Sequence, residues 1–135
     1  MIQRIQKILL LTGTTLWLLG SVCFAVDLDD RDLEFVDARD GTGYYVDVDS
    51  LNFTSDHEVT ACVAMVKSRT NRMFLYSIHF DTAAATYQIM NSRVMRYDTK
   101  EPIGGSDQPL PASGYGIASP MRAIVDYIYN QPHDS

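Results

Sequence analysis

The sequence predicts an α+β fold, in which a single antiparallel β-sheet of about five to six strands packs one face against a C-terminal α-helix. Two observations predict it. Residues 57–81 hold two apolar-rich segments around a polar loop, as a β-hairpin does. Residues 119–130 place apolar side chains at helical spacing close to the C-terminus. We therefore expect one small domain with a single core.

The first 25 residues have the layout of an export signal. Arg4 and Lys7 precede an apolar stretch over residues 8–19, and the letters CFA at 23–25 provide a small-x-small cleavage site. We expect cleavage after Ala25. The protein is then exported, with the periplasm, the cell surface and the medium as possible destinations.

Cleavage would leave residues 26–135 as a single domain. It would retain all 17 acidic side chains but only 9 basic ones, a formal net charge of about −8. This charge favours solubility and disfavours nucleic acid as a partner. The mature chain would keep one cysteine, Cys62, and therefore could form no internal disulfide.

Two alternatives for the N-terminus remain open. Residues 8–26 are uncharged over nearly the roughly 20 residues that a membrane helix requires, so a retained anchor competes with cleavage. Lipid attachment at Cys23 is the other alternative, although Gly20 and Val22 stand where a lipoprotein signal prefers leucine and a small residue. After cleavage we expect no stable membrane span.

The acidic start of the mature chain leads into the first strands. Residues 33–37 and 44–47 read as strands, and the letters DGTG at 40–43 read as the turn between them. A calcium site at Asp37, Asp40 and this turn is a minor alternative, since calcium prefers carboxylate oxygens. A solvated acidic face is the default interpretation.

Two registers compete for the central hairpin, and a slip of one residue would exchange its faces. We favour the register with Arg69 and Thr70 at the centre of the turn, because it gathers one large apolar face. That face holds Val59, Ala61, Val63 and Met65 opposite Phe80, Ile78, Tyr76 and Phe74. The reverse face holds Thr60, Cys62, Ala64, Val66, Leu75, Ser77 and His79. We expect this mixed face to be partly exposed.

The remaining segments are a strand, a loop and a helix. Residues 86–98 read as a strand whose alternation shifts past Met90, which indicates a bulge or bend. Residues 99–116 are rich in proline and glycine and read as a long surface loop. Ser119 and Pro120 suit a helix start. The apolar stripe of that helix comprises Met121, Ile124, Val125 and Ile128.

Several short motifs, taken together, resemble the surface-adhesin protein E family of small exported bacterial proteins. They are YYVDVDSL after the first strand, MFLYSIHFD and TYQIMNSRVMRYD in the centre, and GIASPMRAIVDYI at the closing helix. The resemblance implies a sheet of about six strands with the C-terminal helix packed on it. It also implies binding of host matrix proteins such as vitronectin and laminin, and haem binding is associated with the type.

The chain departs from the family pattern in two places. The family commonly joins the C-terminal helix to the sheet by a disulfide, whereas here Tyr127 and Tyr129 stand near the place of the helix cysteine and the mature chain would hold no second cysteine to pair with Cys62. The early tryptophan of the family is also missing, and Phe35 is its stand-in. These departures put host-protein adhesion in doubt.

Tyrosines from three segments are the candidate partner-binding residues, because tyrosine is enriched at protein interfaces. These are Tyr44, Tyr45, Tyr115, Tyr127 and Tyr129. If they converge outside the core they form a binding patch for an envelope or host-surface protein. The alternative is that most of them fill the seam between sheet and helix.

Cys62 and His79 are weaker candidates, as a pair of ligands for a metal or for haem. No three-ligand zinc spacing accompanies them, and we expect neither a metal nor a cofactor. Basic residues at the hairpin tip, Lys67, Arg69 and Arg72, are read as edge protection.

The sequence therefore predicts a noncatalytic binding module. It contains no G-x-S-x-G nucleophile motif, and Cys62 lies in an apolar strand where a buried, unreactive thiol is the default. The rival functions are a small-ligand carrier, most plausibly for haem, and a structural envelope component.

Overall fold

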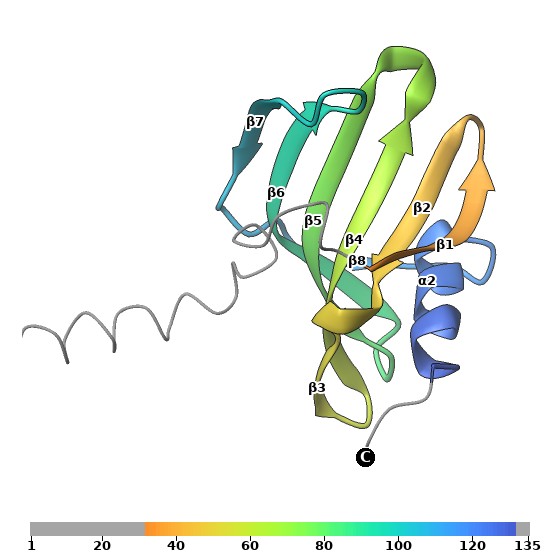
Figure 1. Ribbon diagram of the computed structural model, residues 1–135. Coiled ribbons are helices and arrows are strands. Elements are labelled where there is room, and N and C mark those ends of the chain that lie inside the picture. The colour runs from red at the N-terminus through yellow and green to blue at the C-terminus, as the bar shows by residue number, and fades with distance from the viewer. Residues whose placement is uncertain (1–31, 132–135) are drawn as a thin grey trace, which may run out of the picture.

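The computed structural model describes residues 32–131; the predicted signal peptide at 1–25 and Cys23 lie outside the described residues. One antiparallel sheet of eight strands carries the helix α2 (Pro120–Tyr129) on one of its faces (Figure 1). The predicted α+β class, a single sheet with a C-terminal helix, is confirmed.

Six strands form the main path of the sheet, in the order β1-β2-β4-β5-β6-β7. They are β1 (Leu33–Arg39), β2 (Thr42–Asp47), β4 (Glu58–Lys67), β5 (Arg72–Asp81), β6 (Thr86–Arg96) and β7 (Pro102–Ser106). Two short strands lie off this path: β3 (Asn52–Ser55) pairs with β4, and β8 (Ser113–Gly114) pairs with β6.

The turn between β1 and β2 is tighter than the sequence predicts. Asp40 and Gly41 have φ angles of 53° and 79°, and Arg39 pairs with Thr42 on either side of them. Two consecutive positive φ angles characterise the two-residue hairpin turn that Asp-Gly favours. Gly43, predicted to lie in the turn, therefore belongs to β2.

The favoured register of the central hairpin is confirmed. Val59 pairs with Phe80 and Met65 pairs with Phe74 along β4 and β5. The loop between them ends at Asn71, whose φ of 55° is left-handed. Asparagine tolerates this conformation better than most residues, so no glycine is needed here.

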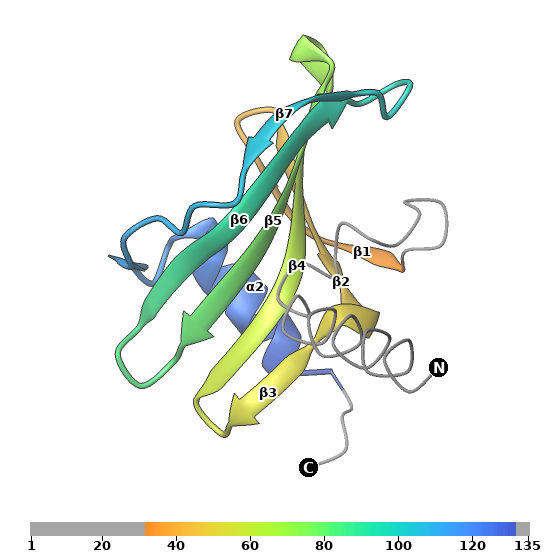
Figure 2. The same ribbon diagram turned by 90° about the vertical axis from the view of Figure 1, so that its left-hand side faces the viewer.

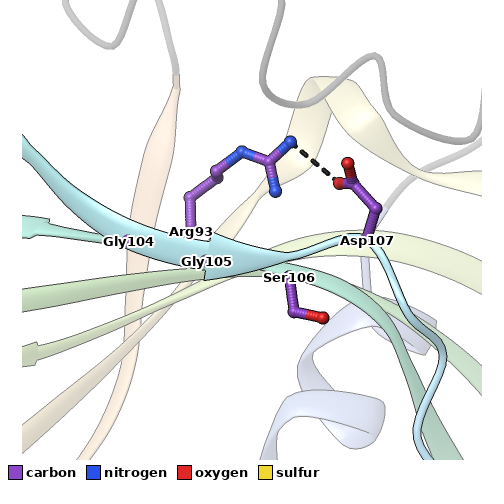
Figure 3. A pocket seen from close by; sticks show the side chains of 5 residues that line it. All are labelled: Arg93, Gly104, Gly105, Ser106 and Asp107. Carbon is purple, nitrogen blue, oxygen red and sulfur yellow. Dashed lines mark ion pairs between the residues drawn. The ribbon is translucent and has the colours of Figure 1, made fainter.

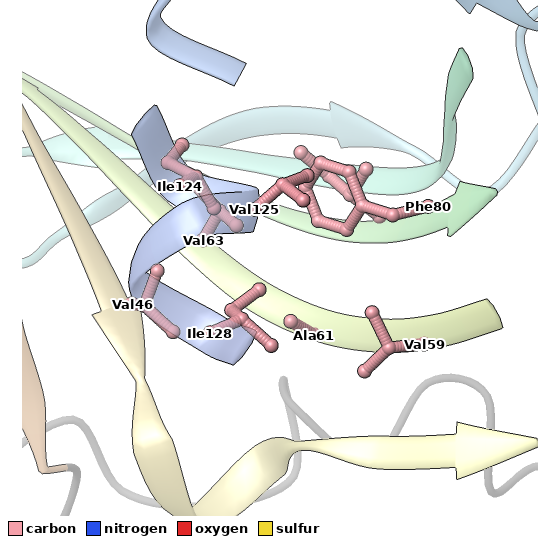
Figure 4. Close-up of a cluster of buried hydrophobic side chains, with 9 residues drawn as sticks. Val46, Val59, Ala61, Val63, Phe80, Ile124, Val125 and Ile128 are labelled. Carbon is pink, nitrogen blue, oxygen red and sulfur yellow. The ribbon is translucent and has the colours of Figure 1, made fainter. Parts of the chain in front are cut away.

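The main core lies between α2 and the apolar face of the hairpin (Figure 4). Ser119 caps the helix, since its hydroxyl accepts a hydrogen bond from the Met121 amide at 3.1 Å. The buried members of this core are Val46, Val59, Ala61, Val63, Ile78, Phe80, Ile124, Val125 and Ile128. The helix therefore holds the first two strands and the central hairpin together (Figures 1 and 2).

A second cluster lies on the sheet face opposite α2. Its buried members are Ala64, Val66, Met73, Leu75 and Met95, with Leu33 and Tyr45 packed against them. Cys62 and Ser77 on this face are also buried. The expectation of a partly exposed face is thus wrong for most of it.

The segment read as a long surface loop is instead tied to β6 for much of its length. Arg93 of β6 pairs with Gly105 of β7, and Tyr87 pairs with Ser113 of β8. Between these strands the Leu110 amide donates to the Ile89 carbonyl at 2.9 Å. Proline and glycine therefore mark an irregular edge of the sheet and not a free loop.

The bulge predicted in β6 is present. Ser77 pairs with Asn91 whereas Ile78 pairs with Ile89, so Met90 is the extra residue. Beyond it the alternation of β6 resumes in the opposite phase, so Ile89 lies against the main core whereas Met95 lies in the second cluster.

Candidate functional site

The adjacent tyrosines of β2 point to opposite faces of the sheet, as neighbouring strand residues do. Tyr44 packs at the rim of the main core. Tyr45 packs against the second cluster, and its ring meets that of Phe35 edge to face, with 5.6 Å between the ring centroids. The pair therefore does not form one continuous surface.

Two of the other candidate tyrosines pack against the main core. Tyr115 lies at its rim, and Tyr129 makes an edge-to-face contact with Phe53 at 5.4 Å. Burial is the largest cause of the raised pKa values of the Tyr44, Tyr115 and Tyr129 phenols. These three side chains thus belong to the seam between sheet and helix.

Tyr127 is placed differently, on the side of α2 that faces β1. Its hydroxyl donates a hydrogen bond to the Glu34 carboxylate. This bond is the largest cause of the raised pKa of the Tyr127 phenol, because ionising the phenol would set two negative charges together. The contact joins the first strand to the last helix.

Cys62 and His79 share the sheet face opposite α2, on neighbouring strands. Cys62 is buried and belongs to no disulfide within residues 32–131, and its amide donates to the Ser50 hydroxyl at 2.8 Å. The Ser50 hydroxyl in turn donates to the Asp47 carbonyl at 2.7 Å. The acidic turn after β2 therefore has a structural role in positioning β4.

Both ring nitrogens of His79 have hydrogen-bond partners on β4. Nδ1 lies 3.2 Å from the Thr60 hydroxyl, and Nε2 lies 3.1 Å from a Glu58 carboxylate oxygen. A carboxylate only accepts, so Nε2 donates, and in the neutral ring Nδ1 accepts from Thr60. Ligation of a metal or haem iron by His79 would require one of these bonds to break.

The row Thr60–His79–Glu58 has the order hydroxyl, imidazole, carboxylate that also occurs in nucleophilic triads. All three side chains come from two paired strands, and the imidazole bridges them. Sequence reasoning singled out His79 but missed Glu58. The hairpin register carried the signal, because it sets Thr60 directly across from His79 and Glu58 on the same sheet face.

Asp37, one of the residues considered for calcium, is engaged locally. Asp37 accepts from the Ala38 amide at 2.8 Å with one oxygen and pairs with the Arg39 guanidinium at 2.7 Å with the other. Within residues 32–131, no cluster of three or more His, Cys, Asp or Glu side chains is arranged to hold a metal ion.

A hollow at the β6–β7 edge is a site that the sequence did not predict (Figure 3). It measures roughly 290 Å³ and is open to solvent. Its lining residues are Arg93, Gly104, Gly105, Ser106 and Asp107. Arg93 and Asp107 meet above the strand, and Ser106 points to its other side (Figure 3).

Contacts to Ser92 and Asp107 hold Arg93 at this edge. Its Nη1 donates to the Ser92 carbonyl at 2.8 Å, and its Nη2 pairs with an Asp107 carboxylate oxygen at 2.8 Å. The Asp107 side chain is 70% exposed, against 35% for Arg93. The guanidinium is thus the anchored partner of this ion pair.

Gly105 makes room for the Arg93 side chain. A Cβ atom at Gly105 would lie 3.1 Å from the Arg93 Cδ and 2.4 Å from the Ser92 carbonyl oxygen. The φ of 152° at Gly105 is also one that side chains rarely adopt. The glycine therefore lets the stem of Arg93 lie over the backbone of β7.

Comparisons of the chain with protein-family models, with curated proteins and with solved structures found no match. None of the helices among residues 32–131 has the length and apolar character needed to cross a membrane.

Proposed function

We propose that the protein is an exported, noncatalytic binding module of the bacterial cell envelope, similar in kind to the surface-adhesin protein E family that it resembles. Its partner is another protein, either of the envelope or of a host surface. The periplasm and the cell surface are the destinations that this role requires.

One observation carries the proposal: each outer strand of the sheet displays a large, half-exposed apolar side chain. Phe35 on β1 is 56% exposed and Ile103 on β7 is 49% exposed. Within residues 32–131, no strand pairs with the outer edge of either strand. Open backbone groups beside apolar side chains are the features through which sheet edges bind other chains.

The rival role as a haem carrier has less support. Its best ligand candidate, His79, is occupied by Thr60 and Glu58, and the neighbouring Cys62 is buried. Tyr44, Tyr115 and Tyr129 lie within the seam between sheet and helix. The geometry therefore favours a protein partner.

Site-specific photo-cross-linking of the full chain in intact bacteria tests the proposal. A benzophenone amino acid at position 103 is expected to give a discrete higher-mass product in the envelope fraction. The same probe at the exposed Ala84, in the turn between β5 and β6, is the matched control. No product from position 103 or position 35 above that control would contradict the proposal.

A further inference from the structure

The outer edge of β7 combines a guanidinium with a strand edge to which no other strand of residues 32–131 is paired. Arg93 crosses from β6 over Gly105, so its charge lies above the last strand of the sheet. Every residue of β7 is exposed. The site therefore offers an extended chain both backbone pairing and a charge partner.

We propose that this edge binds an extended acidic segment of the partner protein. The segment adds as a strand to β7, and one of its carboxylates replaces Asp107 on the Arg93 guanidinium. This inference rests on the proposed function, because it names the surface and the chemistry of the partner of that binding module.

Charge complementarity selects the acidic occupant. Arg93 is the cation in the lining of the hollow, and its planar guanidinium matches a carboxylate better than an ammonium would. Asp107 occupies the position of the partner carboxylate and is itself largely exposed. An exposed ion pair of this kind is weak, so a carboxylate from another chain can displace it.

The composition of β7 confines pairing to a short stretch. Pro102 has no amide hydrogen, which ends a ladder at the start of the strand. Gly104 and Gly105 have no side chains to obstruct an incoming strand, and Ile103 gives it an apolar contact. The partner segment is therefore short and carries an apolar residue beside its acidic one.

The whole chain has a formal net charge of −6, so Arg93 supplies the local positive charge that attracts an acidic segment to this hollow. Removing the charge of Asp107 should strengthen binding, because it removes a carboxylate that competes with the partner for the guanidinium. Removing the charge of Arg93 should abolish it. A merely structural ion pair would not make these two changes act in opposite directions.

Fluorescence anisotropy with the full chain tests the inference. The probe is a labelled heptapeptide of alternating valine and glutamate, and the control peptide carries glutamine in place of glutamate. Asp107→Asn is expected to tighten binding of the acidic peptide about two- to fivefold, as the strength of exposed ion pairs implies. Arg93→Gln is expected to lose it.

Two further variants are matched controls. Arg96→Gln and Asp98→Asn change the same charges on a neighbouring pair, 3.8 Å apart, that does not line the hollow. Neither should alter peptide affinity. Circular dichroism melting of all four variants shows whether each is folded at the assay temperature. If Arg93→Gln is not folded, Arg93→Lys replaces it and should bind the peptide more weakly than the wild type does.

The inference is overturned if both peptides bind the protein equally, or if Asp107→Asn fails to tighten binding. It is also overturned if succinate binds as tightly as the peptide, because strand addition would then contribute nothing. Cross-linking from position 103 that persists in Arg93→Gln would refute the role of Arg93 but leave the binding module standing. Cross-linking absent from every variant would contradict the module itself.

Discussion

Asn71 and Asp98 bind each other reciprocally beside the tip of the central hairpin. The side-chain Nδ2 of Asn71 donates to the Asp98 carboxylate at 3.1 Å. In return, the Asp98 backbone amide donates to the side-chain Oδ1 of Asn71 at 2.9 Å. The hydrogen bond from Asn71 is the largest cause of the lowered pKa of the Asp98 carboxyl. Asn71 therefore fixes the turn by its φ and the following segment by its side chain.

Asn71→Ala is expected to raise the pKa of Asp98 toward its ordinary value of 3.8. Because the folded-state pKa is lowered, this contact stabilises the fold at pH values above 3.8 and is lost as the pH falls through the lowered pKa. Carboxyl chemical shifts followed by NMR between pH 2 and 6 check it. An Asp98 pKa unchanged in the variant would contradict the assignment.

Among single residues, the tyrosine pair shows how far sequence alone can reach. Strand alternation in the letters YYVDVD already implies that Tyr44 and Tyr45 lie on opposite faces. Whether Tyr115 and Tyr129 would join either face depends on the docking of α2, which no local pattern specifies. Arg93 was missed because its position depends on the pairing of β6 with β7, two segments separated by a turn.

At the scale of elements, α2 is the piece on which the main core depends. Ile124 and Ile128 are fully buried between the helix and the sheet. Their spacing in the sequence predicted this stripe, and Ser119 predicted the start of the helix. Local spacing and capping chemistry therefore sufficed here, since both depend on residues within one segment.

Ile124→Ala should lower the free energy of unfolding by about 2–5 kcal/mol, the cost of removing most of a buried aliphatic side chain. Urea denaturation followed by circular dichroism measures it. Asp126→Ala on the exposed side of the same helix is the control. Its ion pair with Arg122, 3.0 Å long, is expected to contribute less than about 0.5 kcal/mol.

The bond between Tyr127 and Glu34 ties α2 to β1 and predicts an alkaline limit of stability. The folded-state pKa of Tyr127 is raised above 10.0, so its contribution is complete below pH 10 and is lost as the pH rises through the raised value. Tyr127→Phe should therefore lose less stability than the wild type between pH 9 and 11. Urea titrations at several pH values test this, with Tyr97→Phe as the control.

In the segment after β6, residues 99–116, composition alone did not predict the secondary structure. Prolines and glycines over residues 99–116 correctly indicate irregular backbone, yet β7 and β8 pair with β6 there. Composition describes the local conformation of a chain but not its neighbours. The pairing depends on β6, whose bulge at Met90 was recognisable from its shifted alternation.

At the scale of the whole molecule, the sheet has an outer strand at each end, β1 and β7, to which no further strand of residues 32–131 is paired. The helix α2 covers one face of the sheet. The α+β class and the hairpin register followed from alternation and helical spacing, which repeat over many residues. The second apolar cluster did not, because small residues such as Ala64 give no pattern that distinguishes burial from exposure. The function proposed above depends on the two outer strands, the least regular parts of the sheet.

Export is the prediction that concerns the whole chain. Intact-mass spectrometry of the protein recovered from an expressing bacterium should give a chain that begins at Val26. A mass that begins at Met1 would indicate a retained anchor, and a lipid-modified chain that begins at Cys23 would indicate a lipoprotein. Full-length chain confined to the cytoplasm would contradict export.

The position of α2 also sets the order in which the protein can fold. Val46 of β2 and Ile128 of α2 share one core, so this core is incomplete until α2 packs on the sheet. A chain emerging from a ribosome therefore exposes the apolar face of its central hairpin until α2 has emerged and packed on it. The helix is thus the element whose docking turns an aggregation-prone intermediate into the folded domain.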